Sequence, residues 1–175
     1  SNAKAEPIKK LMSMAVRELT SSSSFAYHNG ATYKYAEYEV GIVDTDDGNS
    51  EYVVRVPQNH KDSAKNNELF SKSKKLKAFV VYDPRKAALD IDAVMSMVND
   101  VELTLENTRH DDPEMTYAKL PAFVRKFLDF EVDEHGFMHM IRKQNAFTFA
   151  DNRAGMFVML SSKDTAWEQM MTSYD

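Results

Sequence analysis

The amino-acid sequence predicts an α+β protein in which antiparallel hairpins pack with one long amphipathic helix. Three observations support this class: an aromatic and β-branched segment at residues 32–44, a stripe of apolar residues at helical spacing after Pro84, and two short strand-like segments after Leu128. Hairpins and helices follow one another without regular βαβ alternation, which distinguishes α+β from α/β proteins.

Composition sets limits on the function. A chain of 175 residues is long enough for one domain with a sizeable core, or for one domain with an appendage. The net charge of −5 argues against a generic nucleic-acid-binding domain, and the absence of cysteine excludes disulfides and thiolate metal sites. Because the sequence has no apolar run of about 20 residues and no signal peptide, we expect a cytoplasmic protein without a membrane partner.

Residues 1–3 resemble a tag scar left by cloning and are excluded from the fold prediction. Residues 6–19 have apolar side chains at helical spacing, with Pro7 near the first turn, so a helix is expected there. The serine run at 21–24 ends it, since serine side chains compete for backbone hydrogen bonds.

The segment at residues 32–44 is the strongest β signal. Strand alternation places Ala36 and Val40 on one face and Tyr35 and Glu37 on the other. Residues 50–57 can pair with it across the loop "TDDGN", which predicts an antiparallel hairpin.

A basic segment follows the hairpin. Its lysines are Lys61, Lys65, Lys72, Lys74, Lys75 and Lys77. A solvated loop is the favoured interpretation, and contact with a nucleic-acid backbone is the alternative that stays open.

A buried strand and a long helix come next. Residues 76–82 are apolar on both faces, and Asp83 can cap the helix that Pro84 begins. The apolar stripe of that helix is Ala87, Ile91, Val94, Val98, Val101 and Leu105. We expect Ile91, Val94, Val98 and Val101 to be buried.

The last third of the sequence predicts a second hairpin and a final strand and helix. Strands at 129–134 and 137–143 flank a tight turn at His135 and Gly136. A helical or irregular link at 144–153 precedes a strand beginning at Gly155 and a helix from about Asp164.

No self-contained active site emerges from the residue types. The acidic loop around Asp44 and Asp47 lacks the glycine and glutamate positions of an EF-hand, so a hairpin loop is preferred over a calcium site. The five histidines have no metal-ligand spacing, and His139 is expected to be a packing residue. Trp167, with Met170 and Met171, is expected to pack in the core, with base stacking as the alternative.

Three segments in order resemble the DDE transposases of bacterial insertion sequences, the cut-and-paste group with a Tyr-Arg-Glu-Lys signature. They are "LKAFVVYDPRKAALDIDAVMSMV", "DFEVDEHGFMHMIRKQNAFTFADNRAGMFVMLSS" and "KDTAWEQMMTSYD". The similarity spans about residues 75–175, and Tyr174 takes the place of the signature tyrosine. Two departures are Ala154 where the family often has aspartate, and acidic residues in a long helix that is usually rich in arginine.

The resemblance implies a ribonuclease-H-like core in which three carboxylates hold two divalent metals, Mg²⁺ or Mn²⁺, for DNA cleavage and strand transfer. The signature Arg and Glu lie three and seven positions after the Tyr, so we expect this chain to be an inactive fragment between the second catalytic Asp and the Glu. No residue is therefore assigned a catalytic or metal-binding role. The expected parts are residues 4–74, an insertion region at 75–154, and a returning strand and truncated helix at 155–175.

The resemblance also implies DNA as a partner. Its candidate contacts are Tyr174, Lys72, Lys74, Lys75 and Lys77. A homodimer is a second partner to consider. Two other hypotheses stay open: a non-catalytic interaction module that binds a protein through the tyrosine-rich hairpin, and, less favoured, a small metal-dependent hydrolase.

Overall fold

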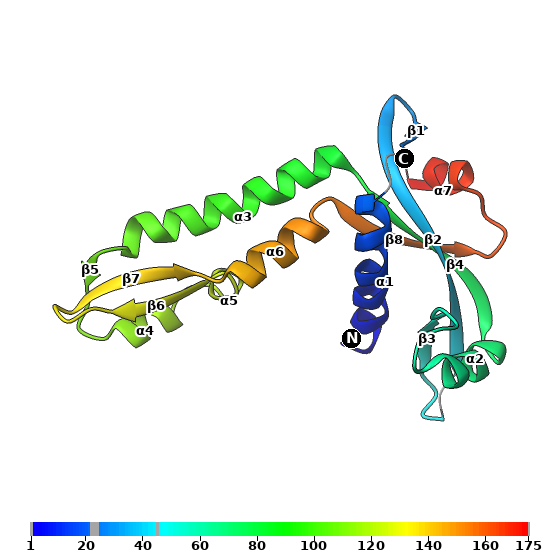
Figure 1. Cartoon of the computed structure of the whole chain (residues 1–175), viewed down its shortest axis with the longest axis horizontal. Coiled ribbons are helices and arrows are strands. Elements are labelled where there is room, and N and C mark those ends of the chain that lie inside the picture. The colour runs from blue at the N-terminus through cyan, green and yellow to red at the C-terminus, as the bar shows by residue number, and fades with distance from the viewer. Residues whose placement is uncertain (1, 22–24, 45, 175) are drawn as a thin grey trace. The chain divides into compact units, whose positions relative to one another are not determined.

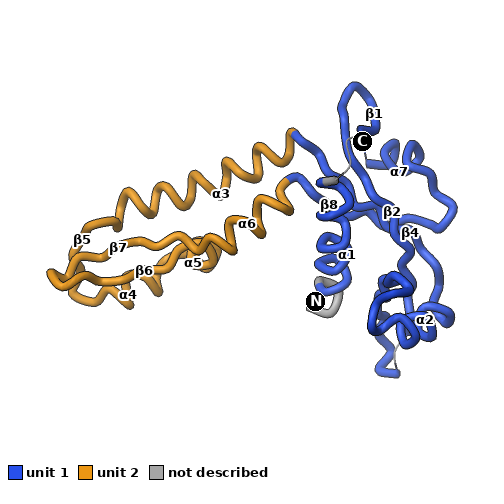
Figure 2. Tube along the Cα trace, viewed as in Figure 1, with its two compact units in different colours: residues 1–84, 155–175 blue, residues 85–154 orange. Residues whose placement is uncertain are grey.

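The computed structural model describes residues 2–21, 25–44 and 46–174, and for residues 2–5 and 21 it describes the backbone alone. It is an α+β protein with two compact units (Figures 1 and 2). Unit 1 comprises residues 1–84 and 155–175, and unit 2 comprises residues 85–154. The sequence predicted that residues 75–154 form one region. In the structure the strand at 74–82 belongs to unit 1, because it pairs with another strand of that unit.

The described part of unit 1 contains a five-stranded antiparallel sheet with strand order β1-β2-β4-β8, and β3 also pairs with β2. The strands are β1 (Ala26–His28), β2 (Ala31–Asp44), β3 (Ser50–Val54), β4 (Lys74–Tyr82) and β8 (Met156–Ser162). The predicted hairpin is confirmed, with Val40 opposite Val54 and Asp44 opposite Ser50. The predicted buried strand is β4, in which Ala78 to Val81 are fully buried.

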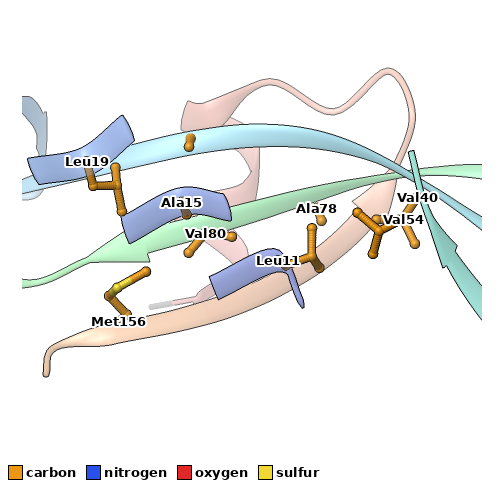
Figure 3. Close-up of a cluster of buried hydrophobic side chains, with 9 residues drawn as sticks. Leu11, Ala15, Leu19, Val40, Val54, Ala78, Val80 and Met156 are labelled. Atoms are coloured by element: carbon orange, nitrogen blue, oxygen red, sulfur yellow. The ribbon is translucent and has the colours of Figure 1, made fainter. Parts of the chain in front are cut away.

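Helices cover both faces of this sheet. Helix α1 (Asn2–Ser21) begins before the predicted start and buries Leu11, Ala15 and Leu19 against Val80 and Met156 (Figure 3). Helix α7 (Trp167–Tyr174) covers part of the opposite face with Trp167, Met170 and Met171. Helix α2 (Ser63–Ser71) connects β3 to β4. The two faces of β2 that strand alternation predicted are thus buried by different helices.

Unit 2 is built on α3 (Pro84–Leu105), which begins at the predicted proline. After it come β5 (Thr108–Arg109), α4 (Pro113–Ala118), α5 (Ala122–Arg125), the hairpin β6 (Leu128–Val132) and β7 (Phe137–Arg142), and α6 (Gln144–Arg153). The tight turn at 133–136 is confirmed by Gly136, whose φ of 84° lies in the left-handed region.

The core of unit 2 is smaller than predicted. Val98 packs with Val124, Phe127 and Leu128, and Val94 and Val101 are partly buried around them. The prediction for Ile91 is wrong: its side chain is 39% exposed. Ala87, Val98 and Leu105 of the stripe are buried, so the exposure of Ile91 interrupts the stripe and does not end it. Among the described residues, no helix is long and apolar enough to cross a membrane.

Candidate functional site

A groove with six charged side chains opens on one face of the unit 1 sheet. Its volume is about 550 Å³. The charged residues are Glu37, Glu39, Arg55, Lys75, Lys77 and Lys163. We call this feature the charged groove. Strand alternation places its glutamates on the same face of β2 as Tyr33, where α7 covers the tyrosine end and leaves the glutamate end open.

The lysines predicted as a solvated loop occupy a helix end and a strand. Lys72 follows α2 and lies 3.7 Å from Glu68, whereas Lys74, Lys75 and Lys77 belong to β4. The loop interpretation is therefore wrong for Lys74 and Lys75, whereas Lys77 lies in the strand predicted at residues 76–82. Alternation along β4 separates them, so that Lys75 and Lys77 line the charged groove and Lys74 does not.

The two lysines of the groove are held by backbone carbonyls. The Lys75 ammonium donates to the carbonyl oxygens of Phe70 and Ser73, at the C-terminal end of α2. This is the helix end that favours a cation, because its last carbonyls have no partner inside the helix. Lys77 donates to the Thr165 carbonyl oxygen at 2.9 Å and lies 3.7 Å from Glu37. Both cations are thus fixed in place at the floor of the groove.

Arg55 forms the other side of the groove. Its guanidinium lies 2.5 Å from the Glu39 carboxylate and 5.4 Å from the centre of the Phe70 ring. The backbone beyond β3 is held by Asn66, whose amide donates to the Val54 carbonyl and accepts from the Val56 amide, at 2.8 and 3.0 Å. Arg55, Lys163 and the two glutamates were not among the predicted site residues; the alternation that places Glu37 and Glu39 on one face was the available signal.

Gly41 allows α2 and its following turn to close over β2. A Cβ atom on Gly41 would lie 1.9 Å from the Ser73 Oγ and 2.4 Å from its Cβ. A side chain at this position would therefore displace the turn that carries Lys75.

The predicted packing of Trp167 is confirmed. Its indole is 5% exposed and stacks on Tyr35, with ring centres 4.2 Å apart and an angle of 5° between the planes. Stacking on a nucleic-acid base would need an exposed indole face. Tyr35 covers one face and the side chain is almost fully buried, so this structure does not support the base-stacking alternative.

Tyr174 lies at the end of α7. Its side chain is 47% exposed, and its ring stacks on Phe157 with centres 5.0 Å apart. One ring face is thus anchored on β8, while nearly half of the side chain stays accessible. Tyr174 and the charged groove are both in unit 1, but Tyr174 does not line the groove.

The expectation for His139 is wrong, because the imidazole is an electrostatic bridge in unit 2. Its Nδ1 lies 2.9 Å from Glu106, and its Nε2 lies 2.7 Å from Asp133. These hydrogen bonds raise the pKa of His139, that to Asp133 most. The same bond to His139, with a backbone bond from Phe137, lowers the pKa of Asp133 to about 2.

Glu106 completes this bridge by accepting a hydrogen bond from the Met140 amide at 2.6 Å. That backbone bond, followed by the bond to His139, lowers the pKa of Glu106. With both ring nitrogens facing carboxylates, the imidazolium form makes the most bonds. The bridge therefore fastens the end of α3 to the β6–β7 hairpin.

The acidic loop near Asp44 lies between β2 and β3, where Ser50 Oγ donates to the Asp44 carboxylate at 3.1 Å. Within the described residues, no group of three or more His, Cys, Asp or Glu side chains is placed to hold a metal ion. The residues present thus do not fit the two-metal centre that the family resemblance implies, and no reaction step is assigned to a metal held by them.

The tyrosine-rich strand that the interaction-module hypothesis relied on is engaged inside the chain. One edge of β2 pairs with β4 over residues 34–42, and the other edge pairs at its ends, with β1 over residues 31–33 and with β3 over residues 40–44. Tyr33 is buried, Tyr35 stacks on Trp167, and the Tyr38 hydroxyl donates to Glu18 at 2.8 Å. These tyrosines are thus engaged within the chain, whereas residues 34–38 have no strand partner on the edge away from β4 among the described residues.

Comparison with known proteins found no match to the chain among family models, curated proteins or solved structures.

Proposed function

We propose that this chain is part of a DDE-class DNA transposase whose complete protein cuts and joins DNA with Mg²⁺ or Mn²⁺. The observation that carries the proposal is the position of unit 2 in the chain. It is inserted between β4 and β8, which are neighbours in the sheet, with Tyr82 opposite Met156 and the Asp83 amide donating to Gly155 at 3.0 Å. A core interrupted by a subdomain and resumed by a strand and a helix is the organisation that the sequence resemblance implies.

Tyr174 is the residue of this chain to which we assign a DNA contact. Its position on Phe157 limits the rotation of the ring and leaves the side chain half exposed. A tyrosine hydroxyl is one of the groups that hold DNA phosphates in register. The proposed role is to position the DNA backbone, and no residue of this chain is proposed as a metal ligand.

The test uses the complete protein encoded by the gene and DNA carrying the ends of the element. We expect cleavage with Mg²⁺ or Mn²⁺, and we expect Tyr174→Phe to slow it about 10-fold to 100-fold, because a hydrogen bond to a charged group contributes about 1.5–3 kcal/mol. Tyr27→Phe is the matched control, since Tyr27 is 77% exposed and lies on β1.

Two results would overturn the proposal. One is a complete protein that neither cleaves nor joins DNA with either metal. The other is a coding sequence without arginine and glutamate three and seven positions beyond Tyr174.

A further inference from the structure

We infer that the charged groove of unit 1 binds a phosphate group, with Arg55 and Lys163 reaching the ligand and Lys75 and Lys77 forming a positive floor. A small phosphate compound and a nucleic-acid backbone offer the same chemistry. Binding of a nucleic-acid backbone rests on the proposed function, whereas binding of a small phosphate compound does not.

The charge of the groove is opposite to that of the chain. Four cationic and two carboxylate side chains line it, so its formal charge is +4 − 2 = +2, whereas the whole chain carries −5. A concave surface with a net positive charge attracts negatively charged ligands. An anion is therefore the class of ligand that this groove attracts.

Two of the four cations have no carboxylate partner in the part of the chain that the structure describes. Arg55 is paired with Glu39 and Lys77 with Glu37. Lys75 bonds to the uncharged acceptors of Phe70 and Ser73, and Lys163 forms no ion pair with the described residues. An anion at Lys75 and Lys163 would supply the missing negative charge.

Two of the cations lie near the ring of Phe70. The Lys75 ammonium lies 4.3 Å from the centre of its ring, and the Arg55 guanidinium lies 5.4 Å from it. The negative face of an aromatic ring attracts a cation, so the ring helps to position both side chains in the groove.

The number of cations favours phosphate over a single carboxylate, because a phosphate group carries more negative charge and more acceptor oxygens. Arginine presents a planar fork of donors that matches phosphate oxygens, and lysine adds a point charge. The groove volume of about 550 Å³ lies in the range of small-ligand sites, so the phosphate can be part of a larger molecule. Arg55 is exposed enough to turn from Glu39 toward a ligand, with 43% of its side chain accessible.

The experiment measures binding of two probes to the purified chain: inorganic pyrophosphate and a short single-stranded oligonucleotide. Lys163→Gln and Arg55→Gln are each expected to weaken pyrophosphate binding about tenfold, as loss of one charge-assisted hydrogen bond predicts. For the oligonucleotide they should also lower the slope of log affinity against log salt by about one each.

Lys10→Gln is the matched control, because Lys10 is an exposed lysine of α1, which packs on the other face of the sheet. Backbone amide shifts at residues 75–77 report whether the ligand is in the groove and whether each variant is folded.

The outcomes separate the two proposals. Binding of pyrophosphate and of the oligonucleotide that Lys163→Gln and Arg55→Gln both leave unchanged would overturn the groove inference and leave the transposase proposal standing. Pyrophosphate binding that both variants weaken, without oligonucleotide binding, would support the groove and count against DNA as its ligand. Absence of binding by both probes at millimolar concentration would overturn the groove inference.

Discussion

Units 1 and 2 are stabilised in different ways. Unit 1 is formed by two separate stretches of chain, and its central strand has four consecutive residues, Ala78 to Val81, with no exposed surface. Unit 2 is one continuous stretch with a cluster of four buried apolar residues. Its long helix is fastened to the hairpin by polar contacts: Glu102 lies 2.7 Å from Arg142, and Glu106 bridges to His139. Unit 1 thus has the larger apolar core, whereas in unit 2 a smaller apolar cluster is accompanied by ion pairs that join its long helix to its hairpin.

The largest expected effect is in the unit 1 core. Phe79→Ala removes a fully buried ring and should lower the free energy of unfolding of unit 1 by about 3–5 kcal/mol. Trp167, the only tryptophan of the sequence, lies in that core, so its fluorescence during urea unfolding measures the change. The control Leu103→Ala alters a side chain that is 85% exposed and should change stability by under about 0.5 kcal/mol. An equal loss of amide protection in β7 would show that the units do not unfold separately.

The next largest effect on stability is expected at Asn66, whose side chain makes buried hydrogen bonds in unit 1. Asn66→Ala would leave the buried Val54 carbonyl and Val56 amide without their side-chain partner, at about 1–3 kcal/mol for each group. Asn67→Ala makes the same change at an exposed neighbour and is the control. Equal midpoints of urea unfolding for the two variants would contradict this role of Asn66.

A side chain added at Gly41 should lower the stability of unit 1 by as much as Asn66→Ala does, or by less. Gly41→Ala introduces a Cβ into the position of Ser73 and is expected to destabilise unit 1 by about 1–3 kcal/mol. The double variant Gly41→Ala with Ser73→Gly should recover most of the loss in thermal unfolding. Failure to recover would mean that Ser73 is not the obstacle.

The smallest expected effect distinguishes unit 2 by its dependence on pH. Because its partners raise the pKa of His139, the bridge contributes stability below the unfolded-state pKa of about 6.5 and loses it as pH rises through the folded-state pKa. The lowered pKa values of Asp133 and Glu106 have the opposite sign, so their contribution is lost as pH falls toward acid.

Amide exchange is measured in β7 of unit 2 and in β4 of unit 1 from pH 5 to pH 9. The protection of β7 relative to that of β4 should decrease as the pH rises. His139→Gln should remove most of that difference, and His135→Gln, an exposed histidine in the adjacent turn, should preserve it. A pH profile that His139→Gln leaves unchanged would contradict the bridge.

Much of the fold followed from local patterns. Alternation identified β2 and its hairpin partner, and Asp83 with Pro84 marked the start of α3, because both signals involve residues close in sequence. The core of unit 2 was predicted less well. Ile91 continues the stripe of α3 but is exposed, since a periodic pattern says which side of a helix is apolar and not how far its neighbours extend.

The candidate sites needed the tertiary structure for the same reason. Lys75 and Lys77 were found among the basic residues, but Lys163 joins them from 86 positions beyond Lys77 because β8 pairs with β4. His139 meets Glu106 across 33 positions and Asp133 across the hairpin turn. Helical and strand periodicity relate residues that are close in sequence, so they do not predict which distant residues meet.

The sequence by itself determined the α+β class, the antiparallel hairpins and the two faces of β2, because backbone geometry repeats every two residues in a strand and every 3.6 in a helix. Only the tertiary structure decided which helix covers each face. Helix α7 covers Tyr33 and Phe79 and stops short of Glu37, so one end of the face is core and the other is a charged groove. Coverage depends on where distant segments return to the sheet, which periodicity does not specify.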